Sequence, residues 1–145
     1  MAARFDRRAG VQAAAVAVVA VLAIAWAVYK HGEQMGRDEL RIQAQELVSQ
    51  AAEGGALLEL AGHRHVNERF RQEHLQQLRG HAMETETRLR ESTFEAQFAP
   101  QGQQLRDVAH GLVSALRSPA LAPGALEPFR AQAHAVDEAL PKDPP

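Results

Sequence analysis

The sequence predicts an all-α protein with a single N-terminal transmembrane helix. After it we expect a long helix, then a helical hairpin or coiled coil, and a Pro-rich C-terminal tail. Three observations predict this class. Residues 11–29 form an apolar run whose only strongly polar residue is Gln12, the chain has only 5% aromatic residues and is rich in Leu, Ala, Glu, Gln and Arg, and no proline precedes Pro100. The abundant residues are good helix formers, and proline is the residue that most often breaks a helix.

The apolar run from Val11 to Tyr29 has the length and composition of a membrane-spanning helix. At a rise of ~1.5 Å per residue it spans ~28 Å, close to the ~30 Å hydrocarbon core of a bilayer. Trp26 and Tyr29 lie at its end, where aromatic rings favour the headgroup level. A cleaved signal peptide is the alternative, with Ala23-Ile24-Ala25 or Ala25-Trp26-Ala27 as the cleavage motif. The length of the run and the bulk of Trp26 favour an uncleaved anchor.

Basic residues before the run predict its orientation. Positive charge near a span tends to stay in the cytoplasm, and the ten residues before it hold three arginines: Arg4, Arg7 and Arg8. We therefore expect 1–10 to be a cytoplasmic tail and 11–29 to be a transmembrane helix of a bacterial inner membrane. The rest of the chain, including the C-terminus, would then be periplasmic.

Residues 30–117 are expected to form an extracytoplasmic helical domain. Apolar and small residues alternate there in steps of three and four, which is typical of a helical seam. Gly54-Gly55 interrupts this seam and predicts a kink or a short loop, because two glycines cost roughly 2 kcal/mol relative to alanine in a helix. The seam consists of Leu40, Ala44, Leu47, Ala51, Gly54, Leu58 and Ala61.

Two further helices are expected in this domain, at 63–98 and 103–117. The first has an apolar stripe that begins with Val66 and Phe70, and the second has the clearest one-sided pattern outside the apolar run. The turn 99–102 between them predicts an antiparallel hairpin. The stripe of the first helix continues through Leu75, Leu78, Ala82, Leu89, Phe94 and Phe98, and the second presents Leu105, Val108, Ala109, Leu112 and Leu116.

The last segment, 118–145, is expected to hold three parts. Residues 118–128 contain three prolines and a glycine and predict a linker. A short helix follows at 129–140, with Phe129, Ala133, Val136 and Leu140 on its inner face. The polar residues 141–145 predict a disordered tail.

Composition excludes several classes of function. The net charge is −2 and the chain has no cysteine, which argues against a nucleic-acid partner and excludes disulfides and thiol chemistry. No serine lies in a nucleophile motif, and no glycine-rich phosphate loop is present. We expect that the protein is not an enzyme and that it needs no cofactor.

Seven histidines are unusual in a chain so poor in aromatic residues. Imidazole and carboxylate groups on one helical face can bind zinc, copper or nickel. The alternative is that these histidines simply face solvent, as the polar residues around them do. The candidate metal ligands are His65, Glu68, His74, His81 and Glu84.

The segment after the apolar run resembles a known family. Tyr29, Gly32, Gly36, Arg37 and Asp38, placed after a hydrophobic N-terminal span, look like the juxtamembrane segment of Rz-type phage inner-membrane spanin subunits. The resemblance covers about residues 10–50. It implies a periplasmic coiled coil whose end binds a small outer-membrane lipoprotein during host cell lysis. The chain departs from the family in lacking cysteine and in its amphipathic helix near the C-terminus.

Together these features predict a membrane-anchored helical scaffold or interaction protein, with spanin-like lysis as one form of that function. One alternative is a periplasmic metal-binding sensor, because the anchor, hairpin and histidines resemble heavy-metal-resistance sensors. Another is an accessory subunit of a larger membrane complex. The expected partners are the lipid bilayer and another membrane or periplasmic protein. Small residues spaced four apart in the apolar run make a homodimer an alternative.

Overall fold

The computed structural model describes residues 34–62 and 67–142 of the chain. One compact unit begins at Met35. The described residues form four α-helices, so the all-α class is confirmed. The helices are α2 (Arg37–Gly62), α3 (Glu68–Glu91), α4 (Ala99–Leu116) and α5 (Glu127–Ala139).

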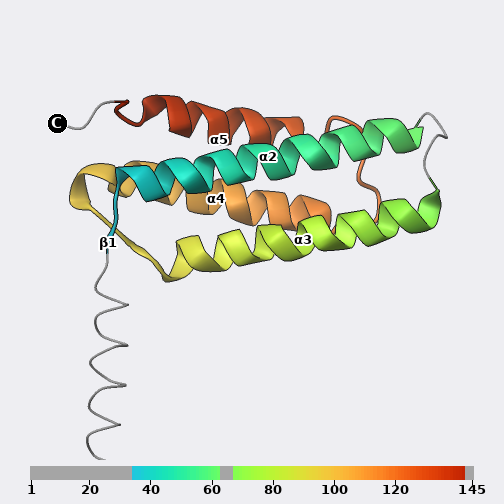
Figure 1. Ribbon diagram of the computed structural model, residues 1–145, viewed down its shortest axis with the longest axis horizontal. Coiled ribbons are helices and arrows are strands. Elements are labelled where there is room, and N and C mark those ends of the chain that lie inside the picture. Colours follow the sequence, from blue (N-terminus) through green and yellow to red (C-terminus); the bar gives the residue numbers. More distant parts are fainter. Residues whose placement is uncertain (1–33, 63–66, 143–145) are drawn as a thin grey trace, which may run out of the picture. The chain divides into compact units, whose positions relative to one another are not determined.

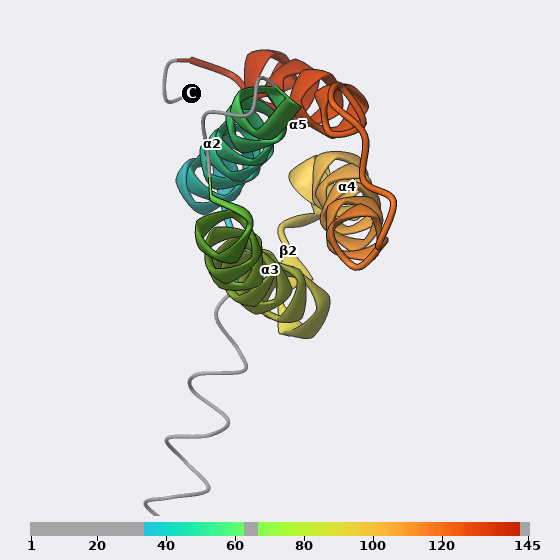
Figure 2. The same ribbon diagram turned by 90° about the vertical axis from the view of Figure 1, so that its right-hand side faces the viewer.

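The four helices form an up-and-down bundle. Each helix runs antiparallel to the one before it, and α5 returns to lie beside α2 (Figure 1). Viewed from one end, the helices surround a common axis in the order α2, α3, α4, α5 (Figure 2). The expected hairpin is present as α3 and α4, and the preceding long helix folds against it. The structure is therefore a bundle and not an extended coiled coil.

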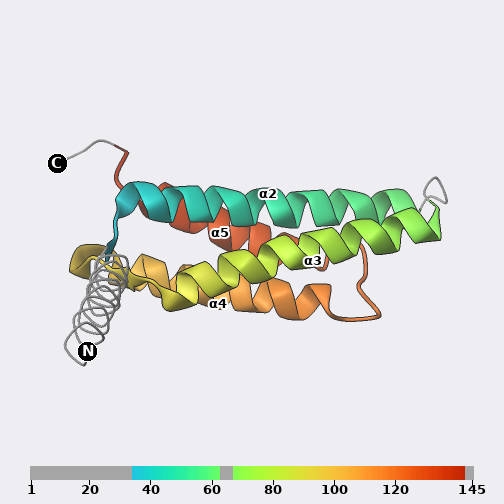
Figure 3. The same ribbon diagram turned by 60° about the horizontal axis from the view of Figure 1, so that its bottom comes forward.

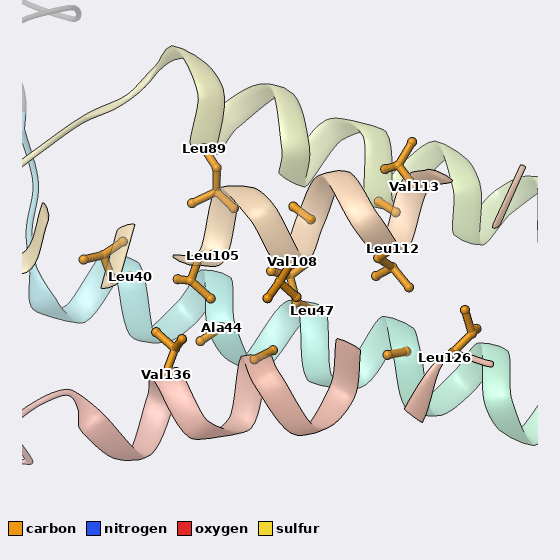
Figure 4. Close-up of a cluster of buried hydrophobic side chains, with 14 of the residues drawn as sticks. Leu40, Ala44, Leu47, Leu89, Leu105, Val108, Leu112, Val113, Leu126 and Val136 are labelled. Atoms are coloured by element: carbon orange, nitrogen blue, oxygen red, sulfur yellow. The ribbon is translucent and has the colours of Figure 1, made fainter. Parts of the chain in front are cut away.

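The core is built from the apolar faces of all four helices (Figure 4). Leu40, Leu47, Leu105 and Leu112 are completely buried, and these residues belong to the stripes predicted for α2 and α4. Removing such side chains from water is the main stabilising contribution to a bundle of this kind. Phe70 is different, because it is 53% exposed although it was expected to start the stripe of α3.

The predicted break at Gly54-Gly55 is wrong, since α2 continues through both residues to Gly62. Gly54 is needed for packing. A Cβ atom there would lie only 2.6 Å from Leu126 Cδ1, at the point where the loop before α5 crosses α2. The missing side chain admits Leu126, which is fully buried, and this contact compensates for the poor helix propensity of glycine.

The predicted turn at 99–102 is also wrong, because α4 begins at Ala99 with Pro100 in its first turn. Proline is tolerated there, since the first backbone N–H groups of a helix have no partner within the helix. The chain reverses earlier, at 92–98. This segment contains strand β2 (Thr93–Phe94), which pairs with β1 (Gln34–Met35), and a 3₁₀ turn, η1 (Ala96–Phe98).

The short helix predicted at 129–140 is confirmed as α5, Glu127–Ala139. Its inward residues Ala133 and Val136 are buried, as is Leu140 directly after it. Because α5 packs against α2 and α4, the segment that follows the proline-rich linker belongs to the same core.

Three helices end against an arginine from a neighbouring helix. Arg106 of α4 donates to the carbonyl oxygens of Leu89 and Ser92 at the end of α3, and Arg79 of α3 donates twice to Leu116 at the end of α4. The last carbonyl groups of a helix have no partner within it and carry partial negative charge. The arginines satisfy them and so fix where each helix ends relative to its neighbour. The third such arginine is Arg41, which contacts the end of α5.

The predicted membrane span 11–29 and the cytoplasmic tail 1–10 lie outside the described residues, as do the last three residues of the predicted disordered tail. Within the described part, no helix combines the length and the apolar character that a membrane crossing requires.

Candidate interaction groove

Two helices of the bundle extend beyond the other two at the end opposite Met35. α2 and α3 have 26 and 24 residues, whereas α4 and α5 have 18 and 13. The views in Figure 1 and Figure 3 both show α2 and α3 continuing past the end of α4. α4 ends at Leu116 because Pro119 follows closely, and the residue before a proline is disfavoured in helical conformation. One face of α3 is consequently left without a helical neighbour.

A groove of about 640 Å³ lies along this uncovered part of α3. One wall is a single face of α3, because its residues are spaced by three and four along the helix. The other wall is the end of α4 and the loop that leads to α5. The groove is lined by Arg71, Gln72, Leu75, Gln76, Arg79, Gly80, Met83, Leu116, Ser118, Pro119 and Leu121.

The groove combines apolar and polar surface. Leu75 and Leu121 are half-buried and pack against the core, while Met83 is 40% exposed. Methionine is flexible and polarisable, so it adapts to partners of different shape. Gln72 and Gln76 add amide groups that can donate and accept hydrogen bonds. Such a surface suits the binding of a peptide or protein segment.

The lining of the groove carries two arginines and no carboxylate. Arg71 donates two hydrogen bonds to the carboxylate of Glu68 in a bidentate pair, at 2.8 and 2.5 Å. This contact holds the pKa of Glu68 below its ordinary value and raises the pKa of Arg71. Arg117 also reaches the groove, because one of its nitrogens lies 3.6 Å from Met83 Sδ. Among the described residues, three arginines therefore lie along the groove and one carboxylate, Glu68, is paired with one of them, which leaves the groove positively charged.

A second cleft, of about 360 Å³, lies between α4 and α5. Its charged lining residue is Asp107, accompanied by Gln104 and Gln132. Val108 and Val136 at its base are buried core residues. The residues that line this cleft include no arginine and no exposed large apolar side chain, unlike those of the groove on α3.

Of the predicted metal ligands, the structure describes Glu68, His74, His81 and Glu84, and it does not gather these four into one site. His74 Nε2 lies 2.6 Å from Glu53 Oε1 of α2, and the imidazole stacks on Phe70 with 5.5 Å between the ring centroids. His81 is exposed. Among residues 34–62 and 67–142, no group of three or more histidine and acidic side chains is close enough to hold a metal ion.

The two predicted carboxylate ligands of the metal site have other partners. Glu84 Oε1 lies 3.4 Å from an Arg88 nitrogen, and Glu68 pairs with Arg71. His65, the remaining predicted ligand, lies outside the described residues. In the part of the chain that the structure describes, Glu68 and Glu84 therefore form ion pairs within α3, and His74 contacts a carboxylate of α2.

The groove is not predicted by the sequence, although parts of both walls are. The spacing of Leu75, Arg79 and Met83 along α3 places them on one side of the helix, and the loop with Pro119 and Leu121 was read as a linker. The sequence does not show that α4 ends before it covers the N-terminal part of α3. That difference depends on how the helices align after folding.

Comparisons with protein-family models, with characterised proteins and with solved structures found no match to this chain.

Proposed function

We propose that this protein is a membrane-anchored helical scaffold that binds another protein through the groove on α3. The apolar run 11–29 would supply the anchor, and the bundle would present the groove. The observation that carries the proposal is the groove itself, a space of about 640 Å³ whose lining includes the exposed Met83 and two arginines. Exposed apolar surface of this kind, bordered by polar residues, is typical of protein interaction sites.

The length of the bundle favours a scaffold over a spanin-like lysis protein. α2 has 26 residues, so the bundle is ~39 Å long at a helical rise of ~1.5 Å. Residues 37–139 in one continuous helix would instead reach roughly 150 Å. A spanin-like protein has to extend from the inner membrane to an outer-membrane lipoprotein, so the bundle would have to open into a longer form before lysis. The closed bundle therefore supports the scaffold or accessory-subunit form of the function.

The test is the partner set of the full-length chain after extraction in mild detergent. A scaffold or accessory subunit is expected to purify in a stoichiometric complex with another membrane or periplasmic protein. A chain that is recovered alone, in the membrane fraction or in the soluble fraction, would contradict the proposal. A partner identified as a small outer-membrane lipoprotein, encoded next to this gene in a lysis cassette, would favour the spanin-like form.

A further inference from the structure

Gly80 lies in the middle of α3, and no packing contact among the described residues of the bundle requires a glycine there. A Cβ atom at Gly54 would approach Leu126 within 2.6 Å, and one at Gly111 would approach Phe129 within 2.5 Å. A Cβ atom at Gly80 would meet nothing within 4 Å. Glycine inside a helix costs about 0.5–1 kcal/mol relative to alanine, so Gly80 weakens α3 without admitting a neighbour from this chain.

The position of Gly80 is informative because it lines the groove. Gln76 and Met83 flank it on the same face of α3, one helical turn before and after. A glycine at this place removes the side chain that would otherwise stand between the backbone of α3 and anything bound there. Small residues are the usual means by which two helix backbones come close together.

We propose that the groove receives an amphipathic helix of a partner protein, with apolar side chains toward Leu75, Met83 and Leu121 and acidic side chains toward the arginines. This inference rests on the proposed function and names the chemistry of the partner. The bound helix would cross α3 at Gly80, in the space left free where α4 ends at Leu116.

Charge complementarity argues for an acidic partner. Arg71, Arg79 and Arg117 lie along the groove. Arg71 is paired with Glu68, whereas Arg79 donates to the Leu116 carbonyl and Arg117 lies beside Met83, so two of the three positive charges have no carboxylate partner among the described residues. The other acidic side chains nearby on α3 are already paired, Glu73 with Arg69 and Glu84 with Arg88. Complementary charge at the border of an interface steers association and suppresses binding of partners with the wrong sign.

The test uses two labelled helical peptides and the full-length chain in lipid nanodiscs, with empty nanodiscs as the blank. Both peptides carry leucines at helical spacing; one has glutamates beside them and the other has lysines at the same positions. Fluorescence anisotropy is expected to show that the glutamate peptide binds at least about tenfold more tightly, a difference of ~1.4 kcal/mol. The preference should weaken as salt is added, because exposed charges are screened.

A pair of glycine variants locates the binding site. Gly80→Leu fills the groove where nothing in the bundle stands in the way, and it is expected to weaken binding of the glutamate peptide about tenfold or more. Gly55→Leu is the matched control. Gly55 also lies inside a helix with nothing within 4 Å of its missing Cβ, but it is not part of the groove lining. Helix content by circular dichroism should be unchanged in both variants.

Equal binding of the two peptides, or no binding of either, would overturn the inference that the partner helix is acidic. Binding that survives Gly80→Leu would overturn the groove as its site. If the full-length chain is a homodimer that Gly80→Leu dissociates, a second copy fills the groove and the inference is wrong. A stoichiometric complex with a membrane protein that persists in Gly80→Leu would leave the scaffold function standing while this inference fails.

Discussion

Arg41, near the start of α2, donates a hydrogen bond of 3.2 Å to the carbonyl oxygen of Leu140, directly after α5. The same guanidinium donates to the carbonyl of Pro141 at 2.7 Å and lies 3.3 Å from the carboxylate of Asp137. One side chain therefore satisfies the end of the last helix and attaches it to the first. This contact closes the bundle between segments that are far apart in the sequence.

Arg41→Ala is expected to destabilise the bundle by about 1–2 kcal/mol, because hydrogen bonds from a charged donor are lost at a partly buried helix end. Equilibrium unfolding of the full-length chain would measure the loss, and hydrogen exchange should increase first in α5. Arg69→Ala is the control, since the Arg69 side chain is 86% exposed and pairs with Glu73 on its own helix. An equal effect of both substitutions would contradict the role of Arg41.

A buried hydrogen bond joins α2 and α3 inside the core. Gln50 Nε2 lies 3.2 Å from Thr85 Oγ1, and the two residues are only 6% and 1% exposed. Gln50 Oε1 has no hydrogen-bond partner among the described residues. The pair therefore fixes the alignment of the two helices while leaving one buried polar atom unsatisfied.

Thr85→Val is expected to cost about 1–2 kcal/mol, because it removes the hydroxyl and leaves the Gln50 amide buried with one partner fewer. Adding Gln50→Leu should recover most of this loss, since both polar groups are then replaced by apolar ones. A double-mutant cycle in equilibrium unfolding would measure the coupling, expected at about 1 kcal/mol. Additive effects of the two substitutions would show that the hydrogen bond contributes nothing.

Two glycines of the bundle should respond in opposite ways to the same substitution. A Cβ atom at Gly102 would overlap with the ring of Phe94, which is also covered by the Arg106 guanidinium at 4.4 Å from the ring centroid. Gly102→Ala is expected to destabilise by about 1–3 kcal/mol, the usual cost of overpacking. Gly80→Ala meets open space and should stabilise by about 0.5–1 kcal/mol. Thermal unfolding midpoints that move in the same direction for both would contradict this assignment.

The helices could be predicted from the sequence because their stripes are local patterns. The spacing from Leu105 to Leu116 identified α4, and Ala133 and Val136 identified the inner face of α5. A strongly one-sided helix shows its buried face in the sequence whatever it packs against.

The breaks between helices could not be predicted, because they depend on contacts that are distant in sequence. Gly54 suggested a break, but Leu126 fills the space above it. Pro100 suggested a turn, but it lies at a helix start, and the reversal occurs earlier at Thr93–Phe94. The groove depends on the relative lengths of α3 and α4 after folding, and for the same reason no local pattern indicates it.

Glu127, the first residue of α5, provides a test of how the stability of the fold depends on pH. Glu127 accepts two hydrogen bonds from Arg130, at 2.8 and 2.6 Å, and this contact lowers the pKa of Glu127 below its ordinary value of 4.5. A carboxyl group whose pKa is lower in the folded state stabilises the fold above its unfolded pKa. That contribution is lost as the pH falls through the folded pKa. The negative charge also interacts favourably with the N-terminal end of α5.

Glu127→Gln is therefore expected to lower the unfolding temperature at pH 7, and the difference from the unsubstituted chain should shrink as the pH falls below the ordinary value of 4.5. Below the folded pKa both chains carry an uncharged group at this position, so their stabilities should converge. Thermal unfolding by circular dichroism at a series of pH values would measure the difference. Glu59→Gln, on the exposed face of α2, serves as the control. A difference for Glu127→Gln that stays constant between pH 7 and strongly acidic pH would show that the charge of Glu127 does not stabilise α5.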